Sequence, residues 1–220
     1  MSATWALALD TAGPIVGLCL ATRDGRCWSW QEAVERGADA ALAPRIAAFL
    51  AEIDPHDPGV VAVVNGPGAF TGLRVGVALA LGVALARQTP VMVCSSLLLR
   101  AATLRHPHIV ALLDARKGRA YVQRFDGAGA LPVALGEAED IHPSALSVSP
   151  GFVAVGQGAI AFADWVAAAG GQIAPEADRV PVECLAALAL DGALPFASAE
   201  AVGLAYLREP DITSPRAPAG

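Results

Sequence analysis

The sequence has 220 residues, of which 55% are hydrophobic and 16% are charged, and its formal net charge is −6. A chain of this length forms one large domain or two small lobes, with a core that needs no disulfide to be stable. The acidic balance argues against unaided binding to a nucleic-acid backbone, because proteins that do so carry a basic face. The N-terminal apolar run ends at Asp10 without a preceding basic region, and the apolar stretch 75–86 is shorter than the roughly 20 residues that span a bilayer. We therefore expect a cytoplasmic protein without a membrane segment.

The first hundred residues predict the order β-β-β-α-β-α-β-α. Apolar runs at 4–10 and 15–21, followed by a turn at Asp24-Gly25, predict a three-stranded antiparallel meander. The other expected elements in this half are a helix at 42–53 with Pro44 in or near its first turn, a buried strand at 60–64, a helix at 71–87, a buried strand at 90–94 and a helix at 96–105, which Ser95 or Ser96 caps.

The second half repeats this theme more weakly. Its expected elements are a hairpin over 108–125 around Lys117-Gly118, a strand at 131–137, a strand at 151–158, a helix near 159–169 and a final helix at 183–190. Each half opens with a meander whose first strand ends in an aspartate, Asp10 or Asp114, which suggests a duplicated α/β unit. We place the first lobe at 1–104 and a smaller, degenerate second lobe at 105–220. A frayed, proline-rich tail is expected over about 208–220, and its return to the first lobe is left open.

A glycine-rich loop, "NGPGAFTGLR" at 65–74, separates a strand from a long helix and raises the question of phosphate binding. A Walker A loop needs a lysine after its last glycine, but Leu73 follows Gly72. A dinucleotide-binding loop needs a glycine where Thr71 stands. The loop fails both tests, so we interpret its glycines as forming a tight strand-to-helix turn.

The helix behind this loop predicts a protein-protein contact. Small residues recur every four positions, at Gly72, Gly76, Ala80 and Ala84. Glycine inside a helix costs about 0.5–1 kcal/mol relative to alanine, so a compensating contact is expected. Apolar residues also occupy the other faces, and a helix that is apolar all round is buried all round. We therefore expect both packing on the helix's own sheet and a protein partner.

Asp10 and Thr11 have two possible explanations. An aspartate that ends a first strand, with a hydroxyl residue behind it, is what a magnesium-phosphate hairpin uses in sugar-kinase-type folds, and Asp114 is its counterpart in the second lobe. The alternative is an Asx turn that stabilises each hairpin. The first explanation makes the chain a small kinase or ATPase that uses Asp10, Thr11 and Asp114 with Mg-ATP, and it remains the alternative function.

Metal and nucleophile chemistry has weaker signals. The four cysteines form no C-x-x-C pair, and their apolar neighbours predict buried core thiols. His106 and His108 lack a third ligand nearby. A peptidase is not indicated, because the sequence offers neither a set of zinc ligands nor an activated nucleophile. Glu137, Glu139 and Asp140 are expected in a solvated loop.

Five motifs together resemble the TsaB (YeaZ) family: "LALDTA" at 7–12, "GPGAFTGLRVG" at 66–76, "DARKGRAYV" at 114–122, "VGQG" at 155–158 and "AYLRE" at 205–209. The resemblance implies an actin/sugar-kinase/Hsp70-like fold of two related lobes with mixed sheets flanked by helices. It also implies a non-catalytic subunit, without a cofactor or the metal-binding histidine motif of the related TsaD.

The resemblance further implies a role in the synthesis of threonylcarbamoyladenosine (t6A) next to the tRNA anticodon. The implied partners are TsaD, which transfers a threonylcarbamoyl group from an adenylate made by TsaC, and the ATPase TsaE; tRNA is contacted only through the complex. Family members also form homodimers through two helices, here about 39–53 and 71–87. The residues expected at the partner interface are Leu42, Arg45, Ile46, Phe49, Gly72, Arg74, Val75, Gly76, Ala78, Leu81 and Gly82.

Overall fold

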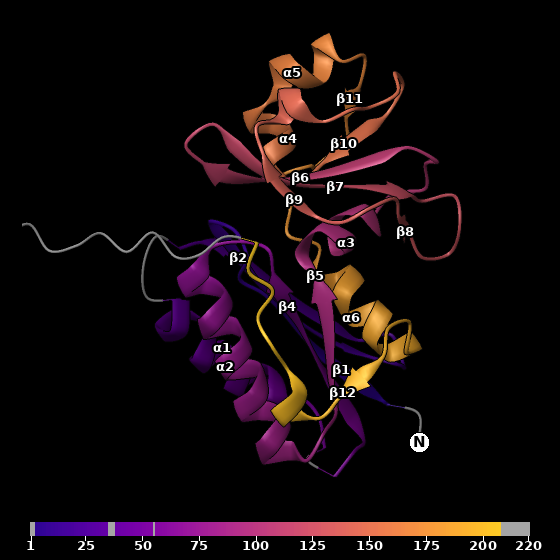
Figure 1. The fold of residues 1–220 in the computed structure, drawn as a ribbon. Helices are drawn as coiled ribbons and strands as arrows, with labels where there is room; N and C mark the ends of the chain where they lie inside the picture. The colour runs from indigo at the N-terminus through magenta and orange to yellow at the C-terminus, as the bar shows by residue number, and fades with distance from the viewer. Residues whose placement is uncertain (1–2, 35–37, 55, 208–220) are drawn as a thin grey trace, which may run out of the picture.

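Two β-sheets form the framework of two lobes in the computed structural model, which describes residues 3–34, 38–54 and 56–207 (Figure 1). The strands of the first sheet are β1 (Trp5–Asp10), β2 (Ile15–Thr22), β3 (Cys27–Ala33), β4 (Gly59–Gly66), β5 (Val91–Ser95) and β12 (Phe196–Ala197). The strands of the second sheet are β6 (Ile109–Arg116), β7 (Arg119–Asp126), β8 (Val133–Ala134), β9 (Glu139–Ile141), β10 (Val153–Val155) and β11 (Gln172–Ile173).

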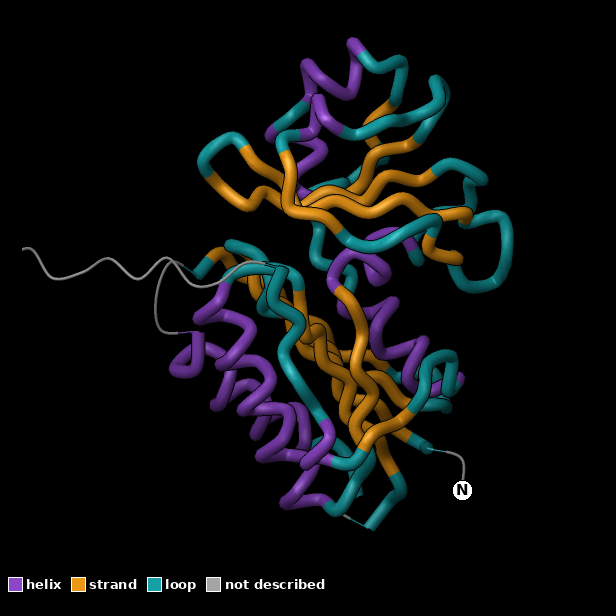
Figure 2. Tube along the Cα trace, in the orientation of Figure 1, coloured by secondary structure: helices purple, strands orange, loops and turns teal. Residues whose placement is uncertain are grey.

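Helices cover these sheets and connect the lobes (Figure 2). They are α1 (Ala38–Leu50), α2 (Phe70–Arg87), α3 (Ser96–Ala101), α4 (Gln157–Ala161), α5 (Ala163–Ala168) and α6 (Val182–Asp191), with 3-10 turns η1 (Pro143–Ala145) and η2 (Ala199–Ala201). Helix α3 lies between the lobes, where the chain passes from β5 to β6. Ser95 caps α3 by accepting hydrogen bonds from the backbone N–H groups of Leu97 and Leu98, as predicted.

The two sheets share one topology, which confirms the predicted duplication. The first has the order β12-β5-β4-β1-β2-β3 and the second the order β11-β10-β6-β7-β8, with β9 also paired to β7. In each, an antiparallel hairpin (β1-β2 or β6-β7) adjoins a strand that runs parallel to its first member, β4 or β10. This arrangement of two related lobes with mixed sheets is the predicted fold class.

Both faces of the first sheet are covered, which explains its uninterrupted apolar strands. Leu7 and Leu9 point into a core cluster with α1 and α2, whereas Ala6 and Ala8 point into a cluster with α6. Figure 1 shows α1 and α2 on one side of this sheet and α6 on the other. The side chains of β1 therefore alternate between two cores while all of them are buried.

The chain passes from the first lobe to the second near the predicted boundary at residue 104, but a later segment that was predicted in the second lobe returns to the first one. Helix α6 packs on β1, β2 and β4, and β12 pairs antiparallel with β5 through Phe196 and Met92. A fold in which α6 stayed on the second lobe would leave one face of the first sheet uncovered. The tail expected at 208–220 lies outside the described residues.

Smaller corrections concern element boundaries. Helix α1 begins at Ala38, so Pro44 lies inside the helix rather than in its first turn; its ring is exposed, and water can solvate the carbonyl that lacks a donor. The helix predicted near 159–169 is split at Phe162, whose φ of −116° departs from helical geometry. Glu139 and Asp140 belong to β9 rather than to a loop, and Asp140 forms an ion pair with Arg119 at 2.7 Å.

Candidate partner-binding surface

One face of α2 packs tightly on its own chain. Its buried residues are Leu73, Gly76, Val77, Ala80 and Ala84. A Cβ atom added at Gly72 or Gly76 would come within 3.0 Å of Thr11, which follows β1. The stripe Gly72-Gly76-Ala80-Ala84 therefore faces its own sheet, and its prediction as the surface for another protein is wrong at these positions.

The loop before α2 also has a glycine at a position where the chain packs too closely for a side chain. A Cβ atom added at Gly68 would lie within 3.0 Å of Ala12, and the Ala69 N–H donates to the Ala12 carbonyl at 2.7 Å. The β1–β2 turn thus occupies the space directly in front of the loop. This contact confirms the interpretation of the loop as a tight packing turn.

The opposite face of α2 is exposed and apolar. It carries Ala78, Gly82, Leu85 and Ala86, and the Leu85 side chain is 62% exposed. A groove of about 290 Å³ runs between this face and α1. Its lining residues are Ala43, Ile46, Leu50, Ala78, Leu79, Gly82, Val83, Ala86 and Arg87. A Cβ atom added at Gly82 meets nothing within 4 Å, so the described residues give this glycine no packing reason.

The other predicted interface residues divide by their burial. Leu42 is fully buried in the core beneath α1, so it is not free to form a contact surface as predicted, whereas Ile46 is mostly buried in the same core but also lines the groove. Arg45, Phe49, Val75 and Leu81 are half-buried, and Arg74, Ala78 and Gly82 are exposed. The exposed apolar surface thus includes Ala78 and Gly82, which were predicted at the interface, and extends to Leu85 and Ala86, which were not.

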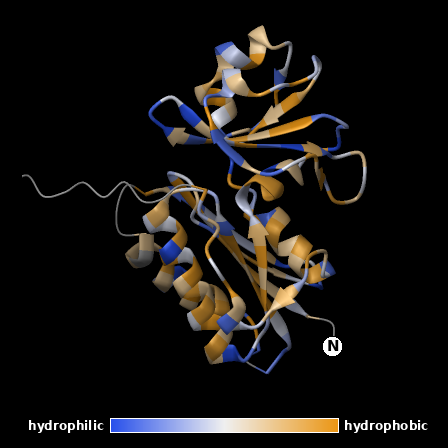
Figure 3. Cartoon of the chain, in the orientation of Figure 1, coloured by the Kyte–Doolittle hydropathy of each residue, from blue (hydrophilic) through white to orange (hydrophobic). Residues whose placement is uncertain are grey.

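Arginines supply the charge of this surface. Arg45 stacks on Trp30 at 4.0 Å and donates to Glu32 at 3.4 Å. Arg74 stacks on Phe70 at 3.8 Å and donates to the Tyr206 hydroxyl at 3.1 Å. Arg87 donates through Nη2 to the Leu50 carbonyl at 3.3 Å, while its Nη1 is buried without a hydrogen-bond partner among the described residues. Figure 3 shows that α1 and α2 consist mostly of hydrophobic residues, with a few hydrophilic positions between them.

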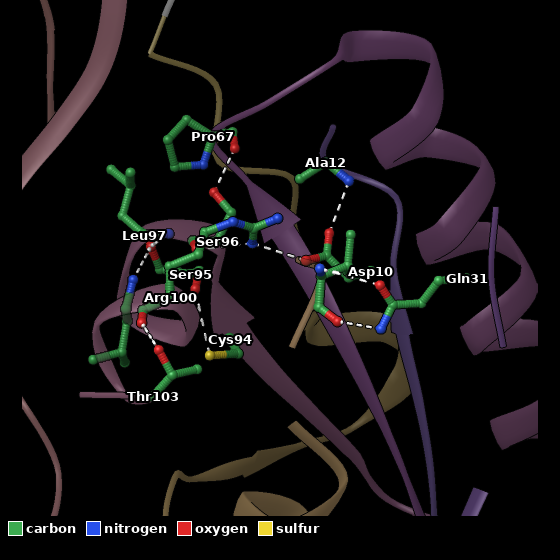
Figure 4. Close-up of polar contacts among 12 residues, drawn as sticks. Asp10, Ala12, Gln31, Pro67, Cys94, Ser95, Ser96, Leu97, Arg100 and Thr103 are labelled. Atoms are coloured by element: carbon green, nitrogen blue, oxygen red, sulfur yellow. Dashed lines mark hydrogen bonds and ion pairs between the residues drawn. The ribbon is translucent and has the colours of Figure 1, made fainter. Parts of the chain in front are cut away.

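Asp10 is committed to structure rather than to a nucleotide. Its side chain is fully buried, its Oδ1 accepts a hydrogen bond from the Ala12 N–H at 2.9 Å, and its Oδ2 forms an ion pair with Arg100 at 2.8 Å (Figure 4). The Arg100 guanidinium therefore neutralises this carboxylate. Sequence reasoning missed Arg100, whose signal was a lone arginine in the otherwise apolar segment "SLLLRA" of α3.

Thr11 and Asp114 also serve local structure. The Thr11 side chain is buried against Gly76 of α2. Asp114 is exposed, and its Oδ1 accepts a hydrogen bond from the Arg116 N–H at 2.7 Å. Both aspartates therefore form the Asx turn that was the alternative explanation.

The cysteines and histidines form no cluster of metal ligands in the part of the chain that the structure describes. Cys19 and Cys94 are buried, Cys184 is half-buried, and Cys27 is exposed, so the expectation of buried thiols is wrong for Cys27. Desolvation by burial raises the pKa of the Cys94 thiol to about 12. His106 accepts a hydrogen bond from the His108 N–H at 3.1 Å, which is a local turn contact.

Helix α2 is also notable for its hydropathy. Within the described ranges it is the one helix whose length and composition would allow it to cross a membrane, with a mean hydropathy of 1.5. A helix with one face against a sheet and one apolar face exposed is typical of a protein-protein contact.

Comparison with known proteins places these features in a family. A model of the TsaD family, described as tRNA N6-adenosine threonylcarbamoyltransferase, matches residues 32–160. The tRNA threonylcarbamoyladenosine biosynthesis protein TsaB of Bacillus subtilis is 32% identical over 119 residues, 52% of this chain and 52% of that protein. TsaB of Escherichia coli is 29% identical over 170 residues, 72% of this chain and 73% of that protein. The match thus spans about half the length of the Bacillus relative.

Solved structures agree with this placement. YeaZ from Pseudomonas aeruginosa superposes with a TM-score of 0.76 at 25% identity, covering 94% of this chain and 100% of that one. A Bacteroides thetaiotaomicron protein with an actin-like ATPase fold superposes with a TM-score of 0.50 at 9% identity, covering 84% of this chain and 96% of that one, which bears on the fold alone.

Proposed function

The chain belongs to the tRNA N6-adenosine threonylcarbamoyltransferase family and within it to the TsaB/YeaZ group, and from this membership we propose that it is a non-catalytic subunit of t6A synthesis. In this role it binds a TsaD-type transferase and supports modification of the tRNA in the cytoplasm. TsaE is the third component of the complex, and tRNA is contacted through the complex rather than by this acidic chain alone.

The single observation that carries this proposal is the exposed apolar face of α2 and its groove with α1. A stable soluble chain of this size gains nothing from leaving Leu85 and the groove uncovered, because apolar surface in water costs about 25 cal/mol per Å². A partner that covers the α1–α2 face would remove this cost.

The non-catalytic role is supported by the residues at the end of β1. Asp10 is fully buried and is held by Arg100 and Ala12, which disfavours a role for its carboxylate as a ligand of a magnesium ion. No contact among the described residues favours the kinase or ATPase alternative.

Binding to a purified TsaD-type transferase, measured by isothermal titration calorimetry, tests the proposal. Gly82→Trp places a large ring on the exposed face, where a Cβ atom at position 82 meets no described atom within 4 Å, and Ala187→Trp places the same ring on the exposed side of α6 as the matched control. We expect Gly82→Trp to weaken binding at least tenfold and Ala187→Trp to bind as the unaltered chain does. Equal binding by all three would show that the surface is wrong.

Reconstitution then tests the role itself. The chain is mixed with TsaC, TsaD, TsaE, ATP, threonine, bicarbonate and unmodified tRNA, and t6A is measured by mass spectrometry of the digested tRNA. We expect t6A to form only with this chain present and to decrease with Gly82→Trp. Full activity without the chain would contradict the proposal.

A further inference from the structure

We propose that β3 is the contact strand of a symmetric dimer, in which a second copy of this chain pairs its own β3 antiparallel to the first, in a register centred on Ser29. This inference goes beyond the proposed function, because it concerns a different surface and a different partner. The described residues that line the α1–α2 groove include none of β3. The inference is carried by the open edge of the first sheet and by the order of the side chains along it.

Strand β3 is the long edge strand of the described chain. It lies at one end of the first sheet and pairs with β2 alone among the described strands. The strands at the other ends of the two sheets, β12, β8 and β11, have two residues each, whereas β3 has seven. Natural sheets protect their edges with short strands, prolines, lysines or bulges, and β3 has none of these. Its edge is therefore open to another strand.

The backbone groups on this edge belong to alternate residues of β3, namely Cys27, Ser29, Gln31 and Ala33. Hydrogen bonds to the other side mark both ends of the β2–β3 pair. The Thr22 N–H donates to the Arg26 carbonyl at 2.9 Å, and the Val34 N–H donates to the Pro14 carbonyl at 3.0 Å. Because antiparallel strands exchange hydrogen bonds at every second residue, the even-numbered residues bond to β2 and the odd-numbered residues face outward. A second strand would bond to these outward groups.

The side chains on the α1 side of β3 are complementary to themselves in the antiparallel direction. Their order along the chain is Arg26, Trp28, Trp30 and Glu32. With Ser29 opposite Ser29 of the second copy, Arg26 faces Glu32 of that copy, and Trp28 faces its Trp30. Opposite charges and aromatic pairs directly across two strands are favourable. A register centred on Trp30 would instead set Trp28 against Glu32, so the side chains favour the register centred on Ser29.

These side chains are accessible to a second copy. Arg26 pairs with Asp24 at 3.1 Å and Glu32 pairs with Arg45 at 3.4 Å, but all four side chains are between 39% and 62% exposed. Exposed ion pairs of this kind are weak and can exchange partners. The two tryptophans of β3 are only half-buried. A second copy would therefore cover aromatic surface that this chain leaves partly exposed.

The first test blocks the edge and leaves the pairing with β2 in place. Ser29→Pro removes an outward N–H, and proline is tolerated where the N–H of an edge strand faces solvent. Ser29→Ala is the matched control, because it loses the same hydroxyl hydrogen bond to Glu183 but keeps the N–H. Self-association of the full chain is measured by sedimentation equilibrium, and circular dichroism melting checks that each variant is folded. We expect the dissociation constant of the dimer to rise at least tenfold in Ser29→Pro and to stay unchanged in Ser29→Ala.

The second test measures the register through charge. Arg26→Glu sets acids opposite each other in the dimer, and Glu32→Arg sets arginines opposite each other, so either variant alone should associate at least tenfold more weakly. An equimolar mixture of the two should associate again, because the mixed dimer has an acid opposite an arginine at both ends of the strand pair. Mixing cannot restore an ion pair that was lost within one chain. Recovery in the mixture therefore distinguishes a contact between copies from a contact within one chain.

Three outcomes would overturn the inference. An unaltered chain that stays monomeric at high micromolar concentration would do so and would leave the proposed function standing. Self-association that persists in Ser29→Pro but is lost in Gly82→Trp would place the second copy on the α1–α2 face instead. A mixture of the two charge variants that does not associate would rule out the register centred on Ser29.

Discussion

The Thr11 side chain fills the space into which a side chain at Gly76 would project. A Cβ atom at position 76 would lie within 3.0 Å of the Thr11 hydroxyl, and Thr11 is fully buried. Thr11 is β-branched, so its side chain has few accessible χ1 rotamers and does not easily rotate out of this space. This contact shows why α2 tolerates a glycine in its interior: the helix lies directly against the end of β1.

The first prediction concerns this contact. We expect Gly76→Ala to lower the free energy of unfolding by about 1–3 kcal/mol, because an added methyl group in a packed core forces other atoms to move. The matched control is Gly82→Ala in the same helix, where nothing lies within 4 Å of the added Cβ. There the gain in helix propensity should raise stability by about 0.5–1 kcal/mol. Urea denaturation measures both, and equal effects would refute the packing assignment.

The second prediction concerns the buried ion pair of Asp10 and Arg100. Asp10→Asn or Arg100→Met alone should cost about 3–5 kcal/mol, because each leaves the other charge buried and unpaired. The double variant should cost much less than the sum of the two. A double-mutant cycle in urea measures this coupling.

An exposed pair provides the comparison. Arg179 and Glu176 are 3.1 Å apart, with side chains 52% and 70% exposed, so Arg179→Met should cost less than about 1 kcal/mol. Additive effects at Asp10 and Arg100 would contradict the view that the pair is a structural unit.

The third prediction concerns the reactivity of the cysteines. Cys27 is exposed, whereas Cys19 and Cys94 are buried, so iodoacetamide should modify Cys27 first and Cys19 and Cys94 only after unfolding. Burial, with a hydrogen bond and a charge interaction with Cys27, also raises the pKa of Cys19. Peptide mass mapping after timed labelling measures the order, and early labelling of Cys94 would contradict it.

The fourth prediction follows from the raised pKa of Cys94, which is about 12 against 9.0 for a free thiol. Above pH 9 the unfolded chain loses this proton while the folded chain keeps it, so the stability that is fully present below pH 9 is lost as the pH rises to about 12. Cys94→Ala should make this decline shallower, although the smaller side chain lowers stability at every pH. Urea midpoints between pH 8 and pH 10.5 measure the slope, and an unchanged slope would refute the assignment.

The fifth prediction concerns the segment that returns to the start of α2. The Ala205 N–H donates to the Asn65 carbonyl at 2.9 Å, and the Tyr206 ring lies 4.9 Å from that of Phe70. Tyr206→Ala should cost about 1 kcal/mol, because it removes the aromatic pair and the hydrogen bond from Arg74. Leu207→Ala, at a neighbouring exposed position, should stay within about 0.5 kcal/mol of the unaltered chain. Thermal melts compare the two, and equal effects would count against a role for this aromatic contact.

The elements that depend on neighbouring residues could be predicted from the sequence. The meander β1–β3 was predicted because apolar runs flank an Asp24-Gly25 turn, and β4 because its valines form an unbroken run. The repeat of this pattern around Lys117-Gly118 indicated the second lobe. These signals are local, since hydrophobic periodicity and turn residues act within a few positions of each other.

Contacts between distant segments could not be predicted. Helix α2 is apolar all round, so no periodic asymmetry indicated which face is buried; the position of Thr11 decides that Gly76 faces inward and Gly82 outward. The pairing of Asp10 with Arg100 joins residues 90 positions apart, and β12 reaches β5 from the other end of the chain.

The sequence by itself therefore determined most of the longer strands and helices and the duplicated plan, because local propensity and pattern specify them. Only the tertiary structure decided which lobe α6 completes, which oxygen of Asp10 pairs with the Arg100 guanidinium and which face of α2 stays exposed. Those outcomes depend on how separate segments fill shared space, and packing of that kind is a property of the whole fold.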